Sequence, residues 1–359
     1  MSVQLVSKEE ITKLLNDWYQ TIISQHVIKA KKLKEEIDNK IHHIEEDQGI
    51  LIYYSLIEFR YKILTCDTEG YEESLGKIEP LPEQAETFLQ YYYHFFKAMY
   101  SIQVANHSDA SLHYDKAEKL LEKIPDEIEK AEFDYMLATF HYQTMNPLAA
   151  INYANKAKEI FSKNEGYENK AAACLNTLGL GCTKLKQFEK AEEHFIAALD
   201  MFKKNNEEHL MNKVKHNLGL LYADQNLSEL AIKYLGDSLK NNPKTMFLLA
   251  REYYKLGENE IAAGIIEQGI KVNQLKEYMC HFSILKALNE KTLKIEKLEE
   301  VIMEGIYYFK GEELWGHVKE YASILGNKYH ELKEYEKSSK YLQMALEADG
   351  KDLEKGALK

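Results

Sequence analysis

The sequence predicts an all-α protein, and three observations lead to this prediction. The 359 residues contain only five prolines, fewer than the turns of a large β-protein would normally need. Hydrophobic residues make up 45% and charged residues 29%, with much Leu, Ala, Glu and Lys, which are good helix formers. Apolar residues also recur at helical spacing along the chain. The chain is too long for one compact helical core, so several units or an extended array are expected.

Two central segments, residues 175–199 and 216–239, share one pattern of small and apolar residues. In each, a Leu-Gly pair is followed about one helix later by regularly spaced small and large side chains. This is the spacing of tetratricopeptide repeats, in which the glycine and the first small residue lie where two helices cross closely. The equivalent positions are Leu178, Gly179, Ala191, Phe195 and Ala198 in the first segment and Leu218, Gly219, Ala231, Leu235 and Ser238 in the second, which also has Tyr222 one turn after its Leu-Gly pair.

Weaker copies of the repeat extend in both directions. They contain Ala98, Ala138, Ala250 and Gly326, and residues 276–310 have room for one more helix pair. We therefore expect about seven repeats. Stacked helix pairs bury a continuous core and curl into a superhelical solenoid, whose concave surface commonly holds an extended peptide.

The predicted domains are a three-helix bundle over residues 1–65, a linker over 66–84 and the repeats over 85–359. The N-terminal residues show three apolar helical stripes that do not fit the repeat. The polar segment 66–84 carries two glycines and two prolines, which favour a linker. Asp47 stands before the third helix and is a candidate N-cap. A bundle on such a linker suggests movement against the repeats, and therefore a switch.

Composition excludes several classes of function. The net charge of −12 opposes nucleic-acid binding, and no stretch approaches the ~18 apolar residues of a membrane span. Four cysteines without a CxxC pair are expected to be free thiols in a reducing cytoplasm. The thirteen histidines show no metal-ligand spacing in the sequence, so we expect no metal site and no cofactor of the chain's own. Motifs of other enzyme classes, such as HExxH, GxxxxGK[ST] and GxSxG, are absent from the sequence.

Several segments of the chain together resemble the Rap family of Bacillus and its phages and plasmids. They are LNDWY (15–19), EEDQGILIYYSLIEFR (45–60), YYYHFFKAMY (91–100), IEKAEFDYM (128–136) and LKQFEKA (185–191). The resemblance implies a bundle and repeats that together grip a response regulator. Some members dephosphorylate the sporulation phosphorelay regulator, whereas others block the DNA-binding domain of a competence regulator without chemistry. A short secreted and re-imported Phr peptide binds the repeats, compacts the molecule and turns it off.

The resemblance assigns the catalytic role to Gln48. A glutamine amide can accept from and donate to one water and align it with the phosphorus of an aspartyl phosphate, while the regulator supplies Mg²⁺. Glu46, Asp47, Leu51 and Phe59 are the expected regulator contacts. An ordinary turn residue is the alternative for Gln48, and bundle core is the alternative for Leu51 and Phe59.

The peptide-binding positions of the family match this sequence only in part. Asn217 matches the family asparagine that grips the peptide backbone, a task suited to a side chain that both donates and accepts. A family acidic position just before LKQ is Lys184 here, a charge reversal that argues against a typical basic peptide. The alternatives are a helix-surface Asn217 and a Lys184 that points to solvent.

Two functions remain open from the sequence. The first is a cytoplasmic, peptide-controlled phosphatase of a response regulator, and the second is a non-catalytic inhibitor that sequesters the regulator's DNA-binding domain. The adjacent His42-His43 also permits a phosphotransfer site, although the sequence contains no visible ATP-binding segment.

Overall fold

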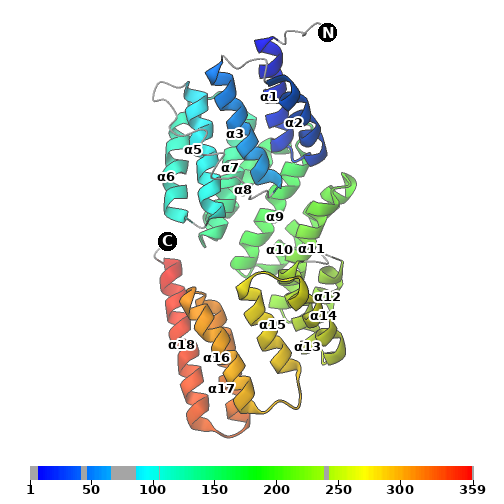
Figure 1. The fold of residues 1–359 in the computed structure, drawn as a ribbon, viewed down its shortest axis with the longest axis vertical. Helices are drawn as coiled ribbons and strands as arrows, with labels where there is room; N and C mark the ends of the chain where they lie inside the picture. Colours follow the sequence, from blue (N-terminus) through cyan, green and yellow to red (C-terminus); the bar gives the residue numbers. More distant parts are fainter. Residues whose placement is uncertain (1–6, 42–46, 66–85, 105, 238–241, 358–359) are drawn as a thin grey trace. The chain divides into compact units, whose positions relative to one another are not determined.

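The computed structural model describes residues 7–41, 47–65, 86–104, 106–237 and 242–357, with side chains up to residue 352. These residues form seventeen α-helices and no strand, which confirms the all-α prediction (Figure 1). Within the described ranges, no helix is both long and apolar enough to span a membrane. The chain divides into two compact units, unit 1 over residues 1–185 and unit 2 over residues 186–359.

Unit 1 begins with the predicted three-helix bundle, made of α1 (Lys8–Ile23), α2 (Val27–Ile41) and α3 (Gln48–Thr65). Ser7 starts α1 by accepting a hydrogen bond from the Glu10 amide at 3.2 Å. The apolar stripe of α1 packs against α2 and α3. Its members are all fully buried: Ile11, Leu15, Trp18 and Ile22.

The first repeat helices complete unit 1. They are α5 (Thr87–Gln103), α6 (His107–Leu121), α7 (Glu127–Gln143), α8 (Pro147–Phe161) and α9 (Glu168–Lys184). The bundle packs on these helices through aromatic side chains: the Tyr19 and Tyr92 ring centroids are 5.0 Å apart, and those of Tyr53 and Phe88 are 5.6 Å apart. The bundle and the first repeats therefore share one core.

Unit 2 contains the remaining repeat helices. They are α10 (Phe188–Lys204), α11 (Glu208–Asp224), α12 (Ser228–Gly236), α13 (Pro243–Lys255), α14 (Asn259–Val272), α15 (Lys276–Asn289), α16 (Ile295–Gly311), α17 (Trp315–Glu331) and α18 (Tyr335–Ala357). Counted along the described chain, α5–α18 are fourteen helices, the number that the seven predicted repeats require.

Glycines sit where the sequence pattern predicts close helix crossings. A Cβ added to Gly219 would lie 2.4 Å from Leu235, and one added to Gly326 would lie 2.7 Å from Leu342. Real Cβ atoms do not approach a neighbour so closely, so any larger residue would push the two helices of the pair apart.

The boundary between the compact units lies within the repeats, after Leu185, and not between bundle and repeats. The reason is the shared core of α1, α3, α5 and α7. The predicted linker 66–84, Glu46 and the pair His42-His43 lie outside the described residues. The sequence division into 1–65, 66–84 and 85–359 therefore stays a prediction.

Candidate functional site

The first turn of α3 is built around Asp47. Its Oδ1 accepts a hydrogen bond from the Ile50 amide at 3.1 Å, and its carbonyl oxygen accepts from the Leu51 amide at 3.2 Å. This contact confirms the predicted N-cap and satisfies one of the amides that a helix start leaves unpaired.

A salt bridge with Lys8 holds the same carboxylate from the side of α1. The hydrogen bond from Lys8, followed by that from the Ile50 amide, holds the pKa of Asp47 below its usual range. The carboxylate is therefore ionised at neutral pH, and it ties the start of α3 to the start of α1.

Gln48 is the first residue of α3, and its side chain is exposed. It follows directly on the fixed Asp47, at the helix end where the backbone dipoles leave positive potential. A primary amide offers both donors and an acceptor without charge. The position therefore presents a neutral group that can orient water near an anionic partner.

Leu51 and Phe59 have different surroundings, although both lie on α3. Leu51 is half-buried, three residues from Gln48 and on the neighbouring side of the helix. Phe59 is fully buried and packs edge-on against Tyr100, with ring centroids 6.0 Å apart. The expectation that Phe59 faces outward is therefore wrong in this conformation, because the residue fills the core between α3 and α5.

The far end of α3 is anchored by a buried ion network that the sequence reasoning missed. Arg60 donates from Nη2 to Glu132 Oε1 at 2.9 Å, and Lys170 Nζ lies 2.5 Å from Glu132 Oε2. The side chains of Glu132 and Lys170 are 0% exposed. One carboxylate on α7 thus joins α3 to α9, in an environment where an unpaired charge would be strongly unfavourable.

A second buried carboxylate, Glu129, lies one turn earlier on α7. The hydroxyls of Tyr19 and Tyr91 donate to its Oε1 at 3.0 and 2.7 Å, and that of Tyr92 donates to Oε2 at 3.3 Å. Burial raises the pKa of Glu129 to about 7, although the tyrosine hydrogen bonds oppose this shift. Glu129 therefore links α1, α5 and α7 through a group that titrates near neutral pH.

The two expected peptide positions fall in different units. Lys184 is the last residue of α9 in unit 1 and is exposed. Asn217 lies on α11 in unit 2 and is half-buried. Each side chain is accessible, and their expected joint role in one groove stays a prediction.

Comparisons with known proteins identify relatives of this chain. The family model for response regulator aspartate phosphatase H, N terminal, matches residues 5–66. Two tetratricopeptide repeat models match residues 129–204 and 213–245. Response regulator aspartate phosphatase E of Bacillus subtilis (strain 168) is 32% identical over 284 residues, covering 74% of this chain and 76% of the relative. Regulatory protein RapG of the same strain is 28% identical over 356 residues, which cover 96% of this chain and 97% of the relative.

A solved structure supports the same assignment along the whole chain. The crystal structure of a Rap protein complexed with Competence and Sporulation Factor matches with a TM-score of 0.81 and 25% identity, covering 97% of this chain and 100% of that one. The repeats, the bundle and the relatives point to one family. The chain belongs to the Rap family.

Proposed function

We propose that this chain is an aspartyl-phosphate phosphatase of a response regulator, controlled by a short peptide that binds the repeats. The observation that carries the proposal is the exposed Gln48 at the start of α3, beside an Asp47 that the cap and Lys8 hold in place. Relatives named response regulator aspartate phosphatase, including phosphatases E and A of Bacillus subtilis (strain 168), support it.

The proposed reaction requires little chemistry from this chain. An aspartyl phosphate is a mixed anhydride, so its acyl carboxylate is already a good leaving group. A water held by the Gln48 amide attacks phosphorus as the bond to the carboxylate breaks, and inorganic phosphate and a free aspartate result. The neutral amide suits this role, because a carboxylate would repel the phosphoryl oxygens. Mg²⁺ belongs to the regulator in this scheme, and the chain supplies no cofactor.

The proposed regulator contacts surround Gln48. Asp47 and the half-buried Leu51 belong to the same helix start, and Glu46 precedes them in the sequence. Leu51 offers an apolar contact of the kind that anchors an interface. Phe59 leaves this set, because it has no exposed surface in this conformation.

Peptide control is the second part of the proposal. Solved relatives include Rap proteins in complex with signalling peptides, among them Competence and Sporulation Factor and the Phr* peptide. We assign the peptide backbone to Asn217 and a side-chain preference to Lys184, which would favour an acidic or neutral peptide residue over a cationic one. Acidic and basic peptides are added at saturating concentration to an assay of regulator dephosphorylation. A change in the rate shows peptide control, and the charge of the peptide that causes it shows the preference at Lys184.

The alternative is a non-catalytic inhibitor that sequesters the DNA-binding domain of a response regulator. The observation in its favour is that relatives of similar identity are named regulatory proteins, RapG among them. In either case we propose that the activity takes place in the cytoplasm, without a membrane and without direct nucleic-acid contact.

The deciding experiment follows the decay of label from a panel of phosphorylated response regulators. We expect at least one regulator to lose its phosphate faster when the wild-type chain is added at catalytic amounts. Tight binding to a regulator or to its isolated DNA-binding domain, without faster decay on any regulator, would overturn the phosphatase proposal in favour of the inhibitor.

A further inference from the structure

Unit 2 brings His317 on α17 close to an acid and a histidine on α15. Glu277 and His281 lie four residues apart on α15, and His317 lies on α17. Glu277 Oε1 is 3.8 Å from His281 Nε2 and 3.9 Å from His317 Nε2. Among the described residues, these three potential ligand atoms lie within 4.8 Å of one another.

We propose that Glu277, His281 and His317 form a binding site for one divalent transition-metal ion of the zinc type. Such an ion takes imidazole nitrogen and carboxylate oxygen at about 2.0–2.2 Å in tetrahedral geometry, which places ligand atoms roughly 3.4 Å apart. The two separations from Glu277 Oε1 are slightly larger, at 3.8 and 3.9 Å, and all three ligand atoms lie within 4.8 Å of one another. Closing the site therefore requires small side-chain rotations and leaves the helices where they are.

The partners of the two imidazoles support this assignment. His281 Nδ1 lies 2.6 Å from the Tyr321 hydroxyl, and His317 Nδ1 lies 3.8 Å from Glu320 Oε2. With each Nδ1 protonated and facing an oxygen, each Nε2 keeps its lone pair for a metal. Metal-binding histidines almost always hydrogen-bond an oxygen through the second ring nitrogen. Tyr321 lies at that distance from His281, whereas Glu320 faces His317 at ion-pair distance.

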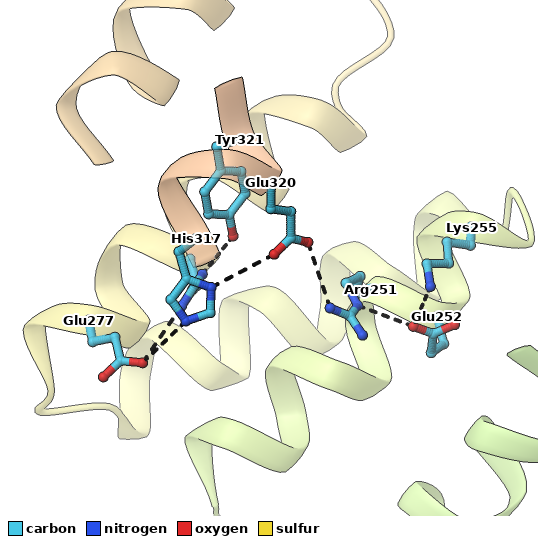
Figure 2. A network of polar contacts seen from close by, with 8 residues as sticks. Arg251, Glu252, Lys255, Glu277, His317, Glu320 and Tyr321 are labelled. Atoms are coloured by element: carbon cyan, nitrogen blue, oxygen red, sulfur yellow. Dashed lines mark hydrogen bonds and ion pairs between the residues drawn. The ribbon is translucent and has the colours of Figure 1, made fainter. Parts of the chain in front are cut away.

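Figure 2 shows His317 between Glu277 and Glu320, with Arg251 connecting Glu320 to Glu252. The Arg251 Nη1 lies 3.8 Å from Glu320 Oε1, and its Nε lies 3.1 Å from Glu252 Oε1. The network therefore continues onto α13 and holds Glu320 in place behind His317.

Exposure fits a site with one fixed and two adjustable ligands. His281 is 2% exposed, whereas Glu277 and His317 are 35% and 37% exposed. His281 is fixed between the rings of Phe247 and Phe309, with centroids 4.7 and 4.8 Å away.

The chemistry of the donor set selects the ion and its role. Two imidazoles and one carboxylate suit Zn²⁺ better than Mg²⁺ or Ca²⁺, which prefer oxygen ligands. Three protein ligands leave a fourth coordination position on the ion, and water can reach it from the half-exposed side of the cluster. The ion would join α15 of the sixth helix pair to α17 of the seventh and stabilise the folded repeats by mass action.

The test uses the full chain without a polyhistidine tag, stripped of metal by a chelator. Zn²⁺ is titrated by calorimetry, and Co²⁺ is followed by its visible ligand-field absorption. We expect one saturable Zn²⁺ per chain, a Co²⁺ band that Zn²⁺ displaces, and a higher melting temperature with Zn²⁺.

Variants locate the site. His317→Ala and Glu277→Gln should each weaken Zn²⁺ binding by more than about tenfold, and Glu320→Gln should weaken it by about tenfold without changing the stoichiometry. The matched control is His330→Ala, an exposed histidine on the same helix, which should bind like the wild type. If the His317→Ala variant has lost helical structure, the Glu277→Gln variant tests the site instead, because Glu277 is half-exposed.

An absence of saturable Zn²⁺ binding by the wild type would overturn the proposal. Equal affinity in the wild type, His317→Ala and Glu277→Gln would do so as well, since the Glu277 contacts would then be ion pairs only.

Discussion

The two ends of α3 carry opposite kinds of polar chemistry. At its start, Asp47 and the exposed Gln48 place polar groups in solvent, and the helix cap and Lys8 keep the backbone in place. Near its other end, Arg60 is 5% exposed and pairs with a Glu132 that has no exposed surface. The same helix therefore exposes polar groups at one end and is fixed in the core at the other.

We expect this difference to separate the stability of the fold from the proposed activity. Side chains at the buried end should determine whether the bundle stays attached to the first repeats, because their charges have no access to water. Side chains at the exposed end should contribute little to folding and much to the proposed reaction. Substitutions at the two ends of α3 and in the core beside it test this separation.

The largest expected effect on stability comes from Glu132→Ala. It leaves Arg60 and Lys170 as buried charges without their shared carboxylate, at a cost of about 3–5 kcal/mol in the free energy of unfolding. Urea unfolding measures the loss. Glu159→Ala, which removes an exposed ion pair with Lys163, is the control and should leave the unfolding midpoint unchanged. Equal midpoints for the two variants would contradict an anchoring role for Glu132.

Glu129→Gln should change the pH dependence of stability. The folded pKa of about 7 lies above the ordinary 4.5, so between these values the folded state binds more protons than the unfolded state. The wild type therefore loses stability as pH rises through this window, by up to roughly 3 kcal/mol from this group. The variant keeps an acceptor for the tyrosines without the charge, so its stability relative to the wild type should rise between pH 5 and pH 8.

Unfolding curves at several pH values measure that difference. Glu127→Gln removes an exposed charge from the same helix without touching the tyrosines and is the matched control. A stability difference between Glu129→Gln and the wild type that stays constant from pH 5 to pH 8 would show that Glu129 is not the titrating group.

A smaller loss is expected from Asp47→Ala. Removing an N-cap side chain typically costs about 1 kcal/mol, and the salt bridge with Lys8 is lost as well. Asp47→Asn keeps the cap and removes only the charge, so it should recover most of the melting temperature. If Asn behaves like Ala, the salt bridge and not the cap holds the start of α3.

The sequence predicted the helices and their close crossings because these depend on local spacing. Gly219 and Gly326 are required where two helices of one pair meet, and the pattern of each pair repeats along the chain. Asp47 was predictable as a cap for the same reason, since a helix start lies within a few residues of its cap.

The buried network and the histidine cluster were beyond sequence reasoning. Glu132 lies 72 positions after Arg60, and its polar character alone indicates an exposed helix face. His281 and His317 come from two separate helices, so no sequence spacing joins them. Phe59 was ambiguous because α3 buries residues on several of its sides, and only packing against Tyr100 decides its place.

The most direct test of the proposed catalytic site compares Gln48→Ala with the wild type on a regulator that the wild type dephosphorylates. Gln48 is exposed, so the variant should melt with the wild type and bind the regulator within a few-fold. Its phosphate decay should fall to the rate of the regulator alone, because no group remains to orient the water. Decay as fast as with the wild type would contradict the assignment of the exposed end of α3 as the catalytic site.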